Sequence, residues 1–270
     1  MKLTTIKVNG KCRVAKVLED KIHVIRTDAT LNEIIEKGDV KQLDALPSEE
    51  VSEFEWANLL QPDKIICVGY NYPKHSKGMK VDLPTTPVLF SKFRDAIAKC
   101  GDEIPMVSYE DTYDYEGELV IVIGKEGYQI PKEEVFDHIF GYTVGNDVSI
   151  RGAQFRTSQY LIGKAMPKSG PIGPYLVSAD EFDPKNKRIE TRVNGELRQS
   201  GNTDEMIFKI EDIVSFASAY FPLHPGDLIF TGTPSGVARE LPEKGYLKDG
   251  DCVSITIEGI GTLTNTMRQY

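Results

Sequence analysis

Glu116 and Glu118, with Gly117 between them, stand immediately before an apolar run at residues 119–123. Side chains at alternate positions of a strand point to the same face, so the two carboxylates are expected to lie side by side. Burying adjacent carboxylates without a partner is unfavourable, and a hard divalent cation that prefers oxygen ligands is the usual counter-charge. A solvated strand end that carries two acids is the alternative.

A third oxygen ligand is available at Asp147, which ends the segment 142–147. A lone Asp at the end of a strand often caps a helix. A third carboxylate would instead close one face of a cation and leave other positions open for a substrate. Glu116, Glu118 and Asp147 together predict an octahedral Mg²⁺ or Mn²⁺ site, and the absence of a nearby His or Cys argues against zinc.

Three further polar residues follow Asp147 along the chain. Arg151 comes four residues later and Gln154 three after that, so a helical turn would place them on one face. Arg can clamp a carboxylate with two hydrogen bonds and Gln can orient a keto oxygen; a surface salt bridge is the alternative for the Arg. Lys164 lies in a mostly uncharged stretch, where a lysine either reaches solvent or serves a site.

Two glycine-bearing segments present additional candidates. The segment 68–75 follows an expected strand and carries Tyr72 and His75; a mobile loop there could act as a lid with a general base, or His75 could simply be exposed. The segment 223–236 ends an expected strand in a loop rich in glycine and threonine that includes Thr233. Backbone amides and hydroxyls in such a loop suit anionic or keto oxygens.

Composition restricts the partners. The net charge of −9 and the pI near 5.1 argue against nucleic acid and anionic membranes, but a local cluster of Lys and Arg would still accept an anionic small molecule. The N-terminus has no apolar signal core, and no run of 18 apolar residues occurs. The four cysteines show no ligand-like spacing. A cytoplasmic location is therefore expected.

Residues 1–61 are expected to form a small α+β domain. Strands at 4–8 and 12–17 flank an Asn9-Gly10 turn, a third strand is expected at 21–26, and a helix at 30–37 is expected to be capped by Asp28 and to end at Gly38. The boundary is placed near Pro62.

Residues 62–270 are expected to form a second, mostly β domain. Short β-branched runs separated by turn residues predict many strands and few helices, the latter at 132–136 and 210–219. The fold class expected is α+β, mostly β, with a folded-over mixed β-roll. The expected strands are 64–68, 88–90, 119–123, 141–146, 175–177, 189–193, 228–231 and 252–257.

Together, these motifs resemble those of the fumarylacetoacetate hydrolase family, in its short bacterial form with a small N-terminal domain. The matching pieces occur in family order over residues 60–265. They are 64–75, 87–92, 114–119, 145–154, 163–164, 170–174, 193–195 with Gln199, and 225–236.

The resemblance implies a mixed β-roll, a homodimer, and Mg²⁺ or Mn²⁺ bound at the positions of Glu116, Glu118 and Asp147. It implies that Lys164 contacts a bound keto acid near the metal and that His75 acts as a base on a lid segment. It also places a set of substrate-binding residues around the pocket, namely Tyr72, Lys92, Arg151, Gln154 and Thr233.

The implied activity is that of an enzyme acting on a 2-oxo acid, either an acylpyruvate or a 2-oxo diacid, through a metal-stabilised enolate. Acylpyruvate hydrolysis, oxaloacetate decarboxylation and isomerisation of 2-hydroxyhepta-2,4-diene-1,7-dioate all pass through such an enolate. Many relatives carry a glutamate three residues after the histidine, where this chain has Gly78. Unless Glu110 or another acid substitutes, His75 would lack its partner. This weakens the case for a hydrolase relative to that for an isomerase or a decarboxylase. The alternative is a catalytically weak member that binds a keto-acid metabolite.

Overall fold

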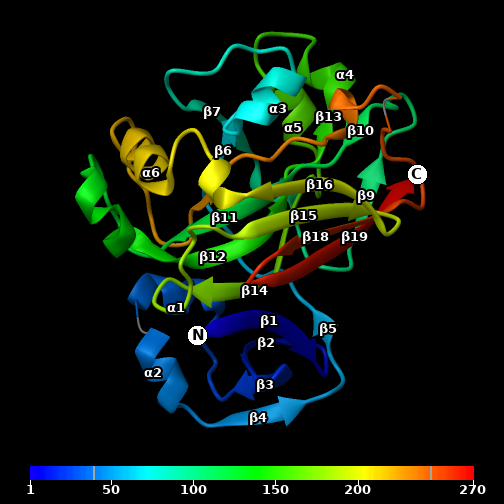
Figure 1. Ribbon diagram of the computed structural model, residues 1–270. Helices are drawn as coiled ribbons and strands as arrows, with labels where there is room; N and C mark the ends of the chain where they lie inside the picture. The colour runs from blue at the N-terminus through cyan, green and yellow to red at the C-terminus, as the bar shows by residue number, and fades with distance from the viewer. Residues whose placement is uncertain (39, 244) are drawn as a thin grey trace.

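A computed structural model describes residues 1–38, 40–243 and 245–270. Its largest element is a mixed sheet that runs in the order β4-β3-β2-β1-β14-β12-β11-β17-β6-β7, with β5 and β8 paired to it off this path (Figure 1). A second sheet of five strands, in the order β16-β15-β18-β19-β9, packs against its central part. The expected mostly β, α+β fold is confirmed.

The N-terminal strands form an antiparallel sheet, as the Asn9-Gly10 turn predicts. β1 (Lys2–Val8) pairs with β2 (Lys11–Leu18), followed by β3 (Lys21–Ile25) and β4 (Ser48–Val51). β1 also pairs with β14 (Gly170–Ser178), which makes this sheet continuous with that of the body. The division into domains 1–61 and 62–270 stays a proposal.

The first helix, α1 (Leu31–Lys37), begins one position later than expected and has a different cap. Thr30, rather than Asp28, is the N-cap, because its hydroxyl accepts from the Glu33 N–H while the Glu33 carboxylate accepts from the Thr30 N–H. Gly38 ends the helix in the left-handed conformation, as predicted.

The body strands that carry the site are β11 (Gly117–Ile123) and β12 (Ile139–Asn146), which form an antiparallel hairpin. The remaining body strands of the large sheet are β17 (Leu228–Phe230), β6 (Ile65–Gly69), β7 (Val88–Lys92), and the short β5 (Glu55–Trp56) and β8 (Ile97–Ala98). The second sheet comprises β16 (Glu196–Asn202), β15 (Arg188–Val193), β18 (Cys252–Ile257), β19 (Gly261–Gln269) and β9 (Glu103–Met106).

Short helices cover the end of the sheet that carries the site (Figure 1). They are α3 (Pro73–Gly78), α4 (Arg151–Gln154) and α5 (Leu161–Lys164), and β10 (Tyr113–Asp114) and β13 (Ser149–Ile150) pair beside them. The helix expected at 210–219 is α6 (Ile210–Ser218), whereas the one expected at 132–136 is a 3₁₀ helix, η2 (Lys132–His138). Six helical elements were not expected from the sequence. They are α3 and α5, together with α2 (Val40–Ala45), η1 (Arg94–Ala96), η3 (Thr203–Glu205) and η4 (Ala238–Glu240), and α3 stands where a mobile loop was expected.

Strand β11 is buried along its whole length because both of its faces are covered. Leu119 and Ile121 belong to the core cluster shared with the second sheet, while Val120 and Val122 belong to the cluster on the opposite face. Glu118 has the same parity as Val120, so it points away from the second sheet. A strand buried on both faces explains the continuous apolar run that follows the two glutamates.

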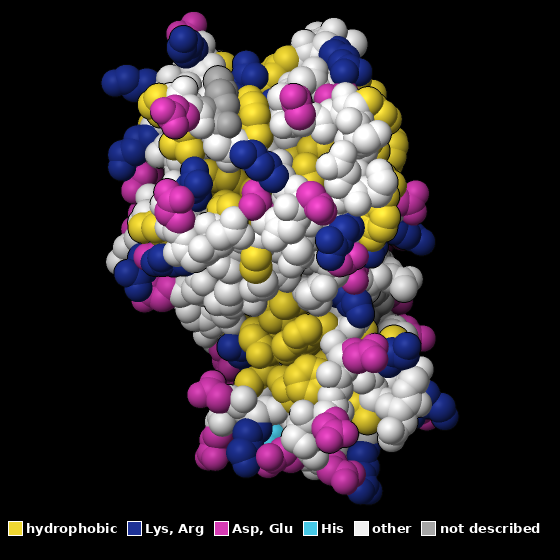
Figure 2. Space-filling view, turned by 90° about the vertical axis from the view of Figure 1, so that its right-hand side faces the viewer, with side chains coloured by type: hydrophobic (Ala, Val, Ile, Leu, Met, Phe, Trp, Pro, Cys, Tyr) yellow, Lys and Arg dark blue, Asp and Glu magenta, His cyan; other side chains and the backbone are white. Residues whose placement is uncertain are grey.

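Seen from the side that carries β5 and the C-terminus, the surface mixes acidic and basic side chains and has one broad apolar area (Figure 2). The basic side chains drawn there do not form a continuous area. Among the residues that the structure describes, no helix has the length and apolar character needed to span a membrane.

The glycine between the two glutamates has a packing reason. A Cβ at Gly117 would clash with Thr191 Oγ1 and lie 3.0 Å from Ile255 Cγ2, both on the second sheet. We expect Gly117→Ala to lower the free energy of unfolding by about 1–3 kcal/mol, the usual effect of overpacking. Chemical denaturation measures this change.

A matched double variant tests the cause. The Thr191 hydroxyl is buried without a hydrogen-bond partner among the described residues, so Thr191→Ala alone should change stability little. Combined with Gly117→Ala it should recover part of the lost stability, because the nearest clashing atom is gone. Strictly additive effects of the two substitutions would contradict the packing explanation.

Candidate active site

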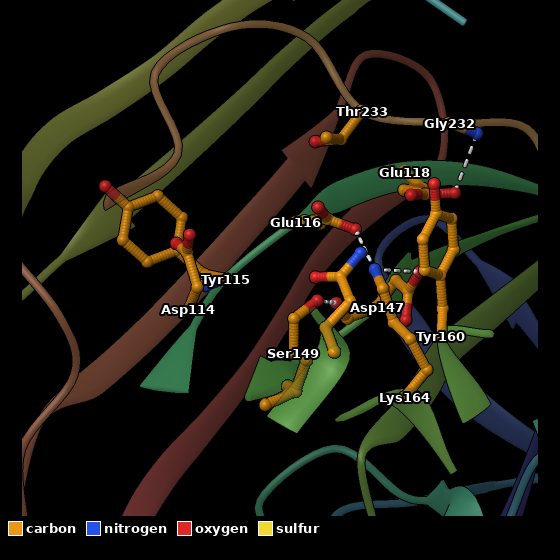
Figure 3. A network of polar contacts seen from close by, with 12 residues as sticks. Asp114, Tyr115, Glu116, Glu118, Asp147, Ser149, Tyr160, Lys164, Gly232 and Thr233 are labelled. Carbon is orange, nitrogen blue, oxygen red and sulfur yellow. Dashed lines mark hydrogen bonds and ion pairs between the residues drawn. The ribbon is translucent and has the colours of Figure 1, made fainter. Parts of the chain in front are cut away.

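The β11–β12 hairpin brings the three predicted metal ligands together. Glu116 directly precedes β11, Glu118 lies in it, and Asp147 directly follows β12. The Asp147 N–H donates to the Glu116 carbonyl at 2.9 Å, which extends the pairing of the two strands. One carboxylate oxygen from each acid lies within 4.8 Å of the other two, and all three acids are buried (Figure 3).

Lys164, from α5, forms ion pairs with two of these acids. Its Nζ lies 2.6 Å from Glu116 Oε2 and 2.7 Å from Asp147 Oδ2 (Figure 3). Burial alone would lower the pKa of Lys164, but the carboxylates of Asp147 and Glu116 outweigh burial and raise this pKa. Burial likewise opposes ionisation of Glu116, yet the charges of Arg151 and Lys164 lower its pKa. The ammonium and the Glu116 carboxylate therefore both remain charged at neutral pH.

Glu118 differs from the other two acids. Its side chain is 2% exposed, and its Oε2 accepts a hydrogen bond from the Gly232 N–H at 2.8 Å. Within the described part of the chain, no Lys, Arg or His forms an ion pair with it. Burial, followed by the charges of Asp147 and Glu116, raises the pKa of Glu118 well above its usual range.

This unpaired carboxylate is the observation that fits a cation. A buried acid without a counter-charge is unfavourable, and three converging carboxylates supply only oxygen ligands. Such a donor set suits Mg²⁺ or Mn²⁺ and does not suit zinc or copper. A divalent ion in this position would be held by Glu116, Glu118 and Asp147.

Arg151 and Gln154 lie together on α4, as the helical spacing predicts. Arg151 is 1% exposed; its Nη2 lies 2.7 Å from Glu116 Oε1, and its Nη1 donates to Gln154 Oε1 at 3.0 Å. Both residues line a cavity beside the three acids. Arg151 therefore holds one of the candidate metal ligands in place.

Lys92 is fully buried behind Asp147 rather than in the cavity lining. Its Nζ lies 2.7 Å from Asp147 Oδ1 and donates to the carbonyls of Val148 and Ser169 at 3.2 and 2.9 Å. With its donors directed at protein oxygens, Lys92 contacts the metal-ligand side of the site. Its predicted role in substrate binding has no support from its position.

Thr233 and Tyr72, the other predicted substrate-binding residues, differ in position. Thr233 lines the cavity, accepts from Gln199 Nε2 at 2.8 Å and donates to the Gly117 carbonyl at 3.0 Å. Tyr72 is not among the cavity-lining residues. Its buried hydroxyl has no hydrogen-bond partner within the described residues.

His75 lies in α3 and is 4% exposed. Its Nδ1 contacts Glu240 Oε1, and because a carboxylate only accepts, Nδ1 carries the proton. The second oxygen of Glu240 accepts from the Gly236 N–H at 2.8 Å, and the Tyr70 ring stacks on the imidazole at 6.0 Å between centroids. Nε2 is thus the nitrogen left for a substrate in the cavity that His75 lines.

Glu240 occupies the space that Gly78 leaves open. A Cβ at Gly78 would lie 2.6 Å from the Glu240 carboxyl carbon. The acid that the family pattern places three residues after the histidine is therefore supplied here by a residue 165 positions away. Glu110, the substitute considered from the sequence, pairs with Arg156 instead.

Sequence reasoning missed Glu240 and also Asp114, which is buried beside Arg151. Glu240 lies in η4, a segment without periodicity, and no sequence signal points from it to His75. Asp114 stands in the same motif as Glu116 and Glu118, so its position near them could have been anticipated. The aromatic walls of the cavity, Tyr70, Phe90 and Tyr160, were not identified either.

The cavity enclosed by these residues measures about 20 Å³. That volume holds about one water molecule. Its polar lining consists of His75, Glu116, Glu118, Arg151, Gln154, Lys164 and Thr233. A cavity of this size leaves no room for an organic substrate, so binding of one requires the α3 segment or the aromatic side chains to move.

Comparison with known proteins defines the class. Residues 64–268 match the model of the fumarylacetoacetate (FAA) hydrolase C-terminal family, and the chain belongs to the fumarylacetoacetate hydrolase family. The resemblance seen in the sequence is thereby confirmed.

Individual relatives are similar over most of the chain. Oxaloacetate tautomerase YisK of Bacillus subtilis is 42% identical over 234 residues, which cover 81% of this chain and 77% of that protein. The human mitochondrial oxaloacetate tautomerase FAHD2A is 41% identical over 241 residues, covering 88% and 76%. The solved structure of a fumarylacetoacetate hydrolase from Exiguobacterium antarcticum matches all of both chains with a TM-score of 0.90 and 36% identity.

The raised pKa of Glu118 predicts a pH dependence of stability. The folded state keeps the proton above about pH 4.3, where an unfolded Glu loses it, so the metal-free protein should lose stability as pH rises from there towards the folded-state pKa. Glu118→Gln should not show this loss. Thermal denaturation with a chelator, across a pH series, measures the difference between the two proteins.

A saturating divalent cation should reverse the trend for the native protein, because the cation favours the ionised carboxylate. The Gln variant should gain much less from the cation. Parallel pH curves for the two metal-free proteins would contradict the assignment of a buried, uncompensated charge to Glu118.

Proposed function

We propose that this protein is a divalent-metal-dependent enzyme that interconverts the keto and enol forms of a small 2-oxo diacid of the oxaloacetate type. The observation that carries the proposal is the buried triad Glu116, Glu118 and Asp147 next to Lys164. Glu116 and Glu118 line the same small cavity as His75, which is paired with Glu240. The names of the similar oxaloacetate tautomerases support the reaction class.

Each group of the site has a part in this chemistry. A bound Mg²⁺ or Mn²⁺ would supply Lewis-acid stabilisation of the 1-carboxylate and 2-oxo oxygens. Lys164 adds a fixed positive charge beside those oxygens, where negative charge develops as the enolate forms. Gln154 and Thr233 line the cavity; the Gln154 NH₂ group can donate to the substrate, whereas the Thr233 hydroxyl already donates to the Gly117 carbonyl.

His75 would transfer the proton. Its Nε2 removes a proton from C3, the electron pair of that C–H bond forms the C2–C3 double bond, and the carbonyl electrons move onto the 2-oxygen. Transfer of the same proton from Nε2 to that oxygen completes the enol and restores the neutral imidazole, and the reverse sequence regenerates the ketone. Glu240 holds the Nδ1 proton and stabilises the imidazolium that forms in between.

Proton migration makes fewer demands on the site than cleavage of a C–C bond. Hydrolysis of an acylpyruvate needs a positioned water and room for a separate acyl product, whereas tautomerisation moves protons within one small molecule. Conversion of the enol, which absorbs in the ultraviolet, with and without a chelator tests the proposal; acetylpyruvate, fumarylpyruvate and 2-hydroxyhepta-2,4-dienedioate test the cleavage and isomerase alternatives.

The second candidate, a catalytically weak metabolite-binding protein, depended on Gly78 depriving His75 of its partner. Glu240 supplies that partner, so no observation now favours this alternative. The homodimer and the cytoplasmic location stay predictions from the sequence.

Two variants separate metal binding from catalysis. Asp147→Asn should abolish metal-dependent turnover and weaken Mn²⁺ binding, because it removes a ligand. Lys164→Met should lower kcat by about 100-fold, a typical loss for a group that stabilises an oxyanion, while Mn²⁺ binds at least as tightly. Calorimetric titration and steady-state kinetics provide the two readouts. Unchanged Mn²⁺ affinity in Asp147→Asn would remove that residue from the ligand set.

The Gly78–Glu240 relationship yields a prediction about the base. Gly78→Ala should displace the flexible Glu240 side chain and lower kcat, with little change in melting temperature because a helix favours alanine over glycine. Glu240→Gln should lower kcat to a similar degree, and His75→Ala by at least as much. If Gly78→Ala is as active as the native enzyme, Glu240 does not act through His75.

A further inference from the structure

Asp114 is fully buried and accepts four hydrogen bonds from two distant parts of the site. Its Oδ1 accepts from the backbone N–H groups of Tyr115 and Ala238 at 2.9 and 2.7 Å. Its Oδ2 accepts from the Arg239 N–H at 3.1 Å and from Arg151 Nε at 2.8 Å. Oδ1 therefore joins the residue that follows β10 to η4, and Oδ2 joins α4 to η4.

One direction from Asp114 leads to the metal ligands. Arg151 donates its Nε–H to Asp114, and its Nη2 lies 2.7 Å from Glu116 Oε1. A guanidinium is planar, so the bond to Asp114 fixes the plane in which Nη2 reaches Glu116. The carboxylate of Asp114 thereby sets the position of a candidate metal ligand without contacting the metal site itself.

The other direction leads to the base. The N–H groups of Ala238 and Arg239 belong to the first turn of η4, and Glu240 is the last residue of that element. Asp114 caps this turn from 124 positions away in the sequence. Tyr115, the next residue along, donates its hydroxyl to the Gly236 carbonyl at 2.9 Å, and Gly236 in turn donates its N–H to Glu240. The position of the carboxylate that holds His75 thus depends on the segment that Asp114 anchors.

We propose that Asp114 is a positioning residue that couples the metal ligand Glu116, through Arg151, to the base pair His75–Glu240, through the backbone of η4. The inference rests on the proposed function, because it assumes that both groups act on one substrate. Asp114 keeps the distance between Glu116 and the His75–Glu240 pair constant. A small 2-oxo acid requires a constant distance, because C3 must lie at the base while the 1-carboxylate and 2-oxo oxygens lie at the metal site.

Asparagine at position 114 is the informative substitution. Asp114 accepts from two pairs of donors, one on each carboxylate oxygen. The amide oxygen of an asparagine can accept from only one pair, and its NH₂ group then points at the donors of the other pair. Repulsion from this NH₂ group would displace Arg151 and the Arg239 backbone, or Ala238 and Tyr115. We expect Asp114→Asn to raise the Kd for Mn²⁺ by about 10–100-fold, as loss of a partner of a metal ligand does. We also expect a loss of at least about 10-fold in kcat at saturating Mn²⁺.

A double-mutant cycle tests whether the kcat effect passes through Glu240. In a Glu240→Gln background, Asp114→Asn should lower kcat at saturating Mn²⁺ by less than about 3-fold, because the residue it positions has already lost its charge. Glu240→Gln alone should leave the Kd for Mn²⁺ unchanged. Calorimetric or electron paramagnetic resonance titration gives the Kd without any turnover.

Asp227 supplies the matched control. It is also fully buried and accepts from the N–H groups of Lys64 and His224, but it precedes β17 at the end opposite Gly232. Asp227→Asn should lower the melting temperature while Mn²⁺ affinity and kcat change less than twofold. Ala238→Pro is a second variant, since it removes the N–H that η4 donates to Asp114 Oδ1, and Val237 has the extended conformation that precedes a proline (φ −63°, ψ 153°). It should lower kcat and leave the Kd for Mn²⁺ unchanged.

The outcomes separate this inference from the proposed function. If the native protein binds no Mn²⁺ and converts no 2-oxo acid, both are overturned. If the native protein does both and Asp114→Asn changes neither readout more than Asp227→Asn does, only the coupling is overturned. Equal kcat losses from Asp114→Asn in the native and Glu240→Gln backgrounds also overturn it. Should Asp114→Asn fail to fold, unchanged kcat in Ala238→Pro overturns the coupling instead.

Discussion

The site depends on an imbalance of buried charge. The β11–β12 hairpin places the acids Glu116, Glu118 and Asp147 within reach of one another, and Asp114 adds a fourth. Three buried bases, Lys92, Arg151 and Lys164, form ion pairs with this group, but none pairs with Glu118 within the described residues. Once Glu118 is ionised, one buried negative charge is left without compensation among these residues. A divalent cation bound there would compensate that charge and give the group a net positive charge, which suits the anionic 2-oxo acid proposed as the substrate.

The candidate base belongs to a different part of the chain from the candidate metal ligands. His75 comes from α3 and its partner Glu240 from η4, while the ligands come from β11 and β12. In the proposed reaction, the metal ligands and the His75–Glu240 pair act on one small molecule, so rigid contacts have to set the distance between them. The bonds of Asp114 to Arg151 and to η4 supply such contacts, and the second sheet, packed against Gly117, fixes the hairpin itself. Stability and chemistry therefore share the same few residues.

The sequence predicted those residues of the site that are close together in the chain, where the alternation of side chains along a strand or the turn of a helix places them on one face. Glu116 and Glu118 share a face because strands alternate, and Arg151 and Gln154 meet because a helical turn brings them together. The family pattern placed His75 and Lys164 at one cavity. Lys92 and Tyr72 were expected beside the substrate, but the structure places Lys92 behind Asp147 and keeps Tyr72 out of the lining. Glu240 could not be predicted, because its partner is 165 positions away and no periodicity links η4 to α3.

Anomalous diffraction from a crystal of the protein with bound Mn²⁺ tests the central claim most directly. We expect a single anomalous peak coordinated by oxygens of Glu116, Glu118 and Asp147, with Lys164 beside the ion. Absence of a peak between these carboxylates at saturating Mn²⁺, with the three acids unchanged and Lys164 still bridging Glu116 and Asp147, would contradict the metal site and the chemistry derived from it.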